Sequence, residues 1–346
     1  MTDRTTQPRA GLALAAGIAF CFGFAALAGA LAQLLPAIPF APDTGAAHYY
    51  WQLPTPTAWT RAAAWTGYLL HQVTIWALIW YAQRSRLGYT AALHPVNVAA
   101  LGANAFFVLL HLGQTHLTYD GLAQDVSIWT SFGSVALLLV IVLIMENRRR
   151  GLFFGHPVAW LNEPGRALRK YHGYYFAWAV IYTFWYHPME GTLGHVAGTF
   201  YTALLMLQGS LFFTRVHTNR WWTVTLEVLV IVHGTLVAVM QDNGMWPMFL
   251  FGFAAIFIVT QMHGLGLPRW LRWGFALTYF GAVAATYATV RTWSALPDVL
   301  RIPITDYVLV FLIAALVWAG MVGTAKLRGR DGQPAALPPA PPATLS

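Results

Sequence analysis

The stretch WYHPMEGTLGH, from Trp185 to His195, places two histidines and a glutamate between two apolar segments. His187 and Glu190 are three residues apart, so on a helix their side chains would share one face. His195 begins the next apolar segment, and a tight connection through Pro and Gly would bring it back to this pair. Imidazole and carboxylate groups together suit Zn, Fe or Mn. We therefore expect a metal site with His187 and His195 as ligands and Glu190 as a ligand or general base.

Other ionisable residues are expected on the same side of the protein. His111 and His233 lie within apolar segments, and His233 is about 12 Å from the nearer end of its segment. Ionisable groups at such depth are costly in a membrane and usually face a cavity or another helix. We expect His111, His187 and His233 to converge, with their imidazole nitrogens within about 10 Å of one another. His116 is a further candidate ligand, and Asp120 a candidate catalytic base.

The composition is that of an integral membrane protein. Of the 346 residues, 58% are hydrophobic and only 9% are charged, whereas a soluble domain carries roughly 25% charged residues. The mean hydropathy is +0.54. Since about 20 apolar residues span a bilayer, we predict an all-α polytopic bundle with about ten transmembrane helices, near residues 11–35, 62–82, 93–117, 126–146, 172–190, 193–214, 221–241, 245–262, 270–290 and 305–325.

The basic residues predict the orientation of these helices. With the N-terminus in the cytoplasm, every Lys and Arg except Arg61, Arg291 and Arg301 falls on the inner side. This is the distribution expected for cytoplasmic loops. It predicts cytoplasmic N- and C-termini in a multi-pass protein of the cell inner membrane. The net charge of +8 is thereby explained by topology and by the anionic lipid bilayer, and it gives no reason to expect nucleic acid as a partner.

The chain is expected to form one transmembrane domain, residues 1–326, followed by a disordered Pro- and Ala-rich tail, residues 327–346. Residues 36–61 form a long outer loop rich in Pro, Tyr and Trp. Within the inner loop 147–171, the sequence NEPG at 162–165 predicts a turn. The first apolar segment is longer than the hydrophobic part of a signal peptide, so we expect an uncleaved helix. The single cysteine, Cys21, excludes a disulfide framework.

Two functions fit this pattern best. The first is a metal-dependent membrane enzyme, with Zn or Fe held near the outer face, that hydrolyses or oxidises a lipid-soluble small molecule. The second is a b-type cytochrome, in which His187 faces His233 on the outer side and His172 faces His217 on the inner side. These spacings resemble those of two-haem bundles of the ferric-reductase type, a resemblance that implies haem b and transmembrane electron transfer.

A third interpretation is a proton-coupled transporter that uses His71, Glu227 and His233 as an intramembrane relay. Each of these residues also has a structural explanation. Glu227, about 9 Å from the inner end of its segment, would be accounted for by an ion pair with an inner arginine or histidine. No protein partner is predicted.

Overall fold

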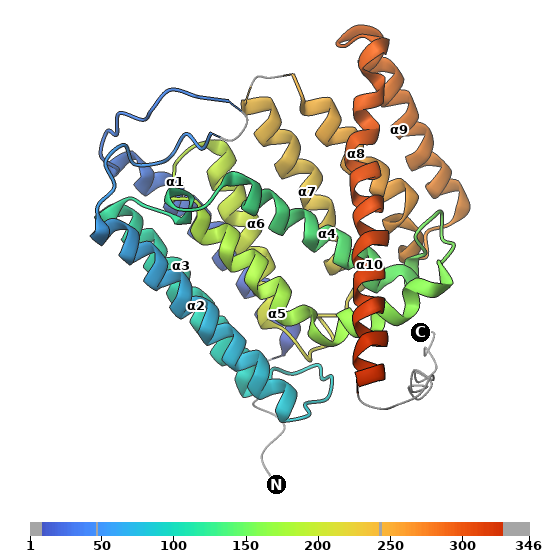
Figure 1. Ribbon diagram of the computed structural model, residues 1–346, viewed down its shortest axis with the longest axis horizontal. Coiled ribbons are helices and arrows are strands. Elements are labelled where there is room, and N and C mark those ends of the chain that lie inside the picture. The colour runs from blue at the N-terminus through green and yellow to red at the C-terminus, as the bar shows by residue number, and fades with distance from the viewer. Residues whose placement is uncertain (1–8, 46–47, 242–243, 328–346) are drawn as a thin grey trace.

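The computed structural model describes residues 9–45, 48–241 and 244–327. These residues form ten α-helices joined by loops and five short 3-10 helices, with three isolated β-bridges. Figure 1 shows α2 and α3 side by side at one edge of the bundle and α9 and α10 at the other. The helices are α1 (Ala10–Leu31), α2 (Ala58–Arg84), α3 (Pro95–Thr118), α4 (Ile128–Arg150), α5 (Asn162–Tyr186), α6 (Leu193–Ser210), α7 (Arg220–Met240), α8 (Trp246–Val259), α9 (Arg269–Thr289) and α10 (Arg301–Leu327).

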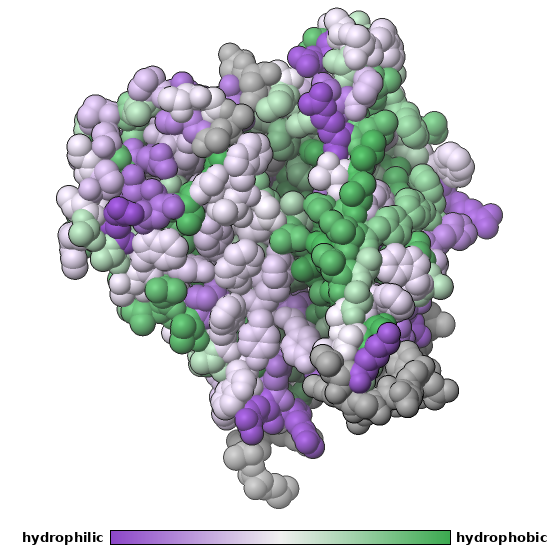
Figure 2. All heavy atoms as spheres, viewed as in Figure 1, coloured by the Kyte–Doolittle hydropathy of each residue, from purple (hydrophilic) through white to green (hydrophobic). Residues whose placement is uncertain are grey.

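All ten predicted apolar segments are helical, which confirms the all-α prediction. Within the described residues, five helical stretches are long and apolar enough to cross a membrane: Ala10–Leu34, Pro95–Thr118, Ile128–Arg150, Arg220–Met240 and Trp293–Lys326. The space-filling view shows a broad region of hydrophobic side chains over α10 and its neighbours (Figure 2). The architecture therefore fits a helical membrane protein. The predicted tail, residues 327–346, lies outside the described residues except for Leu327, which ends α10.

Helix α5 differs from the prediction at its start. The NEPG sequence that predicted a turn forms the first turn of α5, which begins at Asn162. Pro164 is tolerated there because the amide groups of a first helical turn have no acceptor within the helix. Gly165 lies against α4, where an added Cβ would approach the Ile144 carbonyl oxygen to 2.7 Å. The segment is helical because this close packing on α4 outweighs a local turn preference.

Backbone hydrogen bonds join several connections at one end of the bundle. The Ala10 amide donates to the Ala91 carbonyl at 2.9 Å, and the Thr90 amide to the Phe213 carbonyl at 3.1 Å. The start of α1, the α2–α3 connection and the α6–α7 connection therefore lie together. All three are among the segments that the basic residues placed on the inner side.

The outer loop packs at the opposite end. The Gln52 side chain donates to the Ala123 carbonyl at 2.5 Å, and the Leu53 amide to the Gln124 side chain at 3.0 Å. These contacts fasten the loop to the α3–α4 connection. Directly after the end of α3, the Tyr119 ring packs against Phe40, with ring centres 5.9 Å apart. The loop thus covers the region where α3 and α5 end, as its length predicted.

Between these ends, α2, α3 and α5 form a tightly packed core. Trp185 is fully buried, and an added Cβ at Gly67 would lie 2.1 Å from its ring, so only glycine permits this approach. His71, also fully buried, bonds through Nε2 to the Asn104 side-chain oxygen at 2.7 Å. Its Nδ1 accepts from the Trp185 indole at 3.2 Å. Both nitrogens of His71 are therefore satisfied within the core.

Packing is looser along the outer half of α6. This helix contacts α1, α3, α5 and α7, yet none of residues 193–202 is buried, whereas five of residues 203–210 are. A helix among four neighbours normally buries one face, because protein interiors are close-packed. The outer half of α6 is therefore less buried than its inner half.

Candidate functional site

Local sequence rules place His187 and His195 at two helix ends. His187 is extended (φ −101°, ψ 138°) and ends α5, as expected for a residue that precedes proline. Thr192 then caps α6, and its hydroxyl accepts from the His195 amide at 3.3 Å. The returning helix brings the two imidazoles together, with ring centres 5.7 Å apart and planes at 82°. The tight connection predicted for WYHPMEGTLGH is confirmed.

His187 is oriented by the outer loop. Its Nδ1 lies 2.7 Å from the Tyr49 hydroxyl, and no described residue makes a hydrogen bond to its Nε2. His187 packs against the rings of Tyr49, Tyr186 and His195, and such surroundings disfavour a charged imidazole. The ring contact with His195 and the hydrogen bond from His111 to the His187 carbonyl bring three of the predicted residues together, whereas the convergence with His233 stays a prediction. His187 is neutral at pH 7, the form in which an imidazole binds a metal.

His195 is held in one tautomer. Its Nδ1 lies 3.2 Å from the Trp51 indole nitrogen and 2.7 Å from the Thr192 hydroxyl. Because an indole N–H can only donate, the Nδ1 of a neutral His195 must accept. The ring proton is therefore on Nε2. In this tautomer Nε2 of His195 is a hydrogen-bond donor, whereas a metal ligand would need a lone pair on that nitrogen.

His233 faces α6 from α7. An added Cβ at Gly198 would lie 3.1 Å from His233 Cε1, so glycine makes room for the ring. Tyr201 packs beside it, with ring centres 6.1 Å apart. The Nδ1 of His233 is buried and has no hydrogen-bond partner in the described part of the chain. Buried polar atoms are normally satisfied, so this nitrogen is available to a bound group.

His111 and His116 are engaged elsewhere. Nε2 of His111 donates to the His187 carbonyl at 2.8 Å, and its Nδ1 lies 2.8 Å from the Gln114 side-chain oxygen. His116 contacts the carbonyl oxygens of Leu112 and Leu31, at 2.9 and 3.0 Å. Both ring nitrogens of His111 and of His116 contact oxygen atoms of the protein. These histidines therefore fix helix ends, and neither has a nitrogen left to bind a metal.

The two predicted carboxylates have different hydrogen-bond partners. Glu190 accepts from the Tyr119 hydroxyl, a contact that helps to raise the pKa of Tyr119. Asp120 is 3% exposed and accepts from the Gly121 amide at 2.8 Å. Burial raises the pKa of Asp120, whereas Arg61 on α2 lowers it. Glu190 is therefore paired with the Tyr119 hydroxyl, whereas Asp120 is influenced by Arg61 on α2.

Among the residues that the structure describes, no three His, Cys, Asp or Glu side chains are arranged to hold a metal ion. Reasoning from the sequence also missed the side chains that orient the cluster, namely Tyr49, Trp51 and Tyr119. The signal available for the first two was the aromatic composition of the outer loop. The contacts of Tyr49 with His187 and of Trp51 with His195 depend on the path of that loop, so the sequence did not predict them.

A second histidine pair lies at the inner end. His172 on α5 and His217 after α6 have ring centres 6.0 Å apart, with planes at 39°. Nδ1 of His172 lies 2.6 Å from the Arg169 carbonyl, and Nδ1 of His217 lies 2.9 Å from the Gln208 carbonyl. Since a carbonyl only accepts, both Nδ1 atoms carry the proton. The predicted facing of His172 and His217 is confirmed.

Because Nδ1 carries the proton in both rings, Nε2 of His172 and of His217 each has a lone pair. No described residue makes a hydrogen bond to either Nε2 atom. Burial, followed by the neighbouring His172, lowers the pKa of His217 to about 4, partly offset by the hydrogen bond to Gln208. His217 is therefore neutral at pH 7. A neutral imidazole whose Nδ1–H bonds a backbone carbonyl is the usual form of a metal-ligating histidine.

Glu227 is accounted for by an ion pair. The buried Arg150 donates through Nη2 to Glu227 Oε1 at 2.6 Å, and its Nη1 bonds the second oxygen. A bidentate geometry of this kind satisfies both charged groups. The predicted pairing with an inner arginine is confirmed.

Comparisons with known proteins give no relative. No protein-family model matches the chain, no curated protein matches its sequence, and no solved structure matches its fold. The site must therefore be interpreted from its own geometry.

Proposed function

We propose that this chain is a transmembrane b-type cytochrome that holds one haem between His172 and His217 at its inner end. The observation that carries the proposal is the facing of these two rings with Nδ1 fixed and Nε2 free. Metal–imidazole bonds are about 2 Å long, so two imidazoles that held one metal ion between them would have ring centres about 6 Å apart. The observed separation of 6.0 Å supports this arrangement.

The outer cluster supports a second haem, with His187 and His233 as axial ligands. Each has one nitrogen without a hydrogen bond to the described residues, at Nε2 and Nδ1 respectively. The unburied outer half of α6 lies between the helices that carry them. His195 would donate its Nε2–H to the edge of the group, and the Trp51 contact keeps that tautomer. The bound iron would alternate between the ferric and ferrous states as one electron arrives and leaves.

The two sites define a path for electrons across the membrane. His172 lies ten residues into α5 and His187 directly follows its last residue, about 22 Å farther along the helix. With ten spans, cytoplasmic termini and an inner-membrane location, the chain would pass electrons between the cytoplasmic and outer sides. The distribution of Lys and Arg supports that orientation.

One observation still supports the metal-dependent enzyme, the function that we predicted first. His187 and His233 could bind a Zn or Fe ion, with Glu190 nearby as base and a lipid-soluble molecule as substrate. Its weakness is that His111 and His116, two of its expected ligands, donate or accept elsewhere. The transporter hypothesis is supported less, because His71 and Glu227 are both paired within the bundle.

An absorption spectrum of detergent-purified protein, oxidised and then reduced with dithionite, tests the proposal. We expect a Soret band, sharpened α and β bands on reduction, and two haems per chain. His217→Ala should remove about half of the haem, while His156→Ala, an exposed inner histidine, should retain all of it. Protein that contains Zn or Fe by elemental analysis but shows no Soret band would instead support the metal-dependent enzyme.

A further inference from the structure

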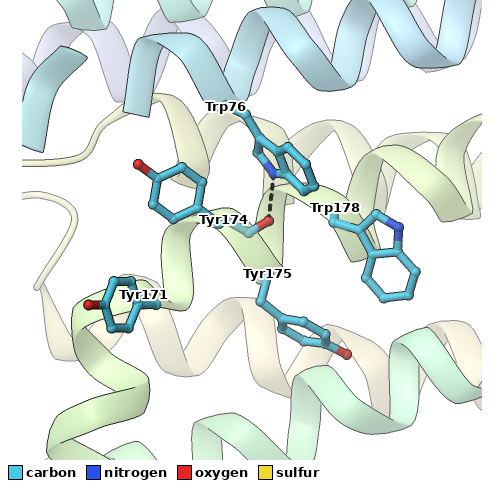
Figure 3. Close-up of a pocket in the computed structure, with 5 residues that line it drawn as sticks. All are labelled: Trp76, Tyr171, Tyr174, Tyr175 and Trp178. Carbon is cyan, nitrogen blue, oxygen red and sulfur yellow. Dashed lines mark hydrogen bonds between the residues drawn. The ribbon is translucent and has the colours of Figure 1, made fainter. Parts of the chain in front are cut away.

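An aromatic cleft lies between α2 and α5, beside the inner histidine pair. It has a volume of about 440 Å³ and is lined by Trp76, Tyr171, Tyr174, Tyr175 and Trp178. Figure 3 shows these rings around the space, with the Trp76 indole donating to the Tyr174 carbonyl. Ligand pockets are commonly of this size and lined by aromatic side chains.

The lining residues show which kind of molecule would fit. All five are aromatic, and rings of this kind bind a flat conjugated ring by offset stacking. The Tyr174 and Tyr175 hydroxyls are already bonded, to the Gln83 side chain at 3.1 Å and the Ser134 carbonyl at 3.2 Å. The walls therefore present ring faces and few free polar groups. A lipid-soluble ring molecule is favoured over a charged or sugar-containing one.

The cleft is connected to the inner pair by short steps between rings. Tyr175 contacts Phe176 with ring centres 6.1 Å apart, and Phe176 contacts His172 at 5.5 Å. A molecule stacked on Tyr175 would be separated from the His172 ring by only these two contacts. This contiguity distinguishes the cleft from an ordinary groove filled by lipid chains.

We propose that the cleft binds the ring of a membrane quinol, which reduces the inner haem. This inference rests on the proposed cytochrome function and names its electron donor. In the reaction, both O–H bonds of the quinol break and the ring becomes a quinone. The two electrons would be accepted one at a time by the two ferric haems that His172, His217, His187 and His233 would hold. The two protons pass to water at the inner interface, where Tyr171 is exposed.

The kinetic test uses anaerobic, haem-loaded protein mixed with a short-chain quinol, with haem reduction followed at the α band. Trp76→Leu and Trp178→Leu keep apolar bulk but remove the ring faces, and should slow reduction at least tenfold while dithionite still reduces all the haem. Trp80→Leu is the matched control: Trp80 lies one turn along α2, beneath Arg84 and outside the cleft. It should react at the parental rate. Parental rates in all three variants would overturn the proposal.

A binding test separates the quinol site from the haem proposal. A photoreactive azidoquinone should label peptides of α2 and α5 near Trp76 and Tyr175, and excess unlabelled quinol should prevent the labelling. This result is expected whether or not the protein carries haem. Labelling elsewhere, or labelling that quinol does not displace, would mean that the cleft holds lipid only. Displaceable labelling in protein without a Soret band would refute the cytochrome function and leave the ring-binding site standing.

Discussion

His111 on α3 holds the backbone of His187 at the end of α5: its Nε2 donates to the His187 carbonyl at 2.8 Å. His111 is fully buried, so removal of the ring would leave that carbonyl and the Gln114 side chain unsatisfied. We predict that His111→Ala lowers the free energy of unfolding by about 1–3 kcal/mol, yet retains the inner haem. Thermal unfolding and haem content in detergent measure both. Loss of bound metal with unchanged stability would instead make His111 a ligand.

The ion pair of Arg150 and Glu227 is buried, with 2% and 11% of the two side chains exposed. Removing Glu227 leaves the buried Arg150 only the longer contact with Glu146, at 3.7 Å, and breaking a buried ion pair costs about 3–5 kcal/mol. Glu227→Gln should therefore lower the thermal unfolding midpoint clearly. The double variant Arg150→Met/Glu227→Leu, which removes both charges, should recover much of the loss. A Glu227→Gln protein as stable as the parent would contradict a structural role for the pair.

Asp120 should make stability depend on pH in a direction opposite to that of a salt-bridged carboxylate. Its folded pKa is raised by burial above an unfolded value of about 3.9. Its stabilising contribution is thus present at low pH and lost as the pH rises through the folded pKa. Asp120→Asn should therefore raise the unfolding temperature at about pH 8, with a smaller effect at about pH 4.5.

The control for this prediction is Asp125→Asn. Asp125 pairs with Arg61 and accepts from the Trp65 indole at 2.7 Å, so its loss should destabilise the protein at neutral pH. An Asp120→Asn variant less stable than the parent at about pH 8 would show that the Asp120 carboxylate is stabilised in the folded protein.

Tyr49 should tune the outer haem. If His187 held iron through Nε2, as proposed, its Nδ1–H would donate to the Tyr49 oxygen, which lies 2.7 Å from Nδ1. This bond makes the ligand more basic and favours ferric iron. Tyr49→Phe should therefore raise the midpoint potential of the outer haem and leave the inner one unchanged, as measured by spectroelectrochemical titration. A shift in the midpoint potential of the inner haem alone would contradict a role of Tyr49 at the outer site.

The orientation can be tested with reporter fusions. A periplasm-active reporter joined after Lys326 should be inactive, because the distribution of Lys and Arg predicts a cytoplasmic C-terminal end. The same reporter inserted in the outer loop near Pro54 should be active. Reporter activity after Lys326 would show that the predicted orientation is wrong. The sites called inner and outer would then exchange names.

The sequence by itself determined the helices. Long apolar runs can satisfy their backbone groups in lipid only as helices, so all ten were found within a few residues, except at the start of α5. Local rules also determined the two helix ends at His187 and His195, because Pro188 and the Thr192 cap act over a few residues. The facing of His172 and His217 followed from helix spacing in the same way.

Only the tertiary structure decided which histidines are free. His111 and His187 looked equivalent in the sequence, yet Nε2 of His111 is occupied by a carbonyl from another helix, and the tautomer of His195 depends on Trp51 in a distant loop. Hydrogen bonds of this kind join residues far apart in the chain, so their geometry depends on how the helices and the outer loop pack together. No periodicity or spacing within a segment carries that information.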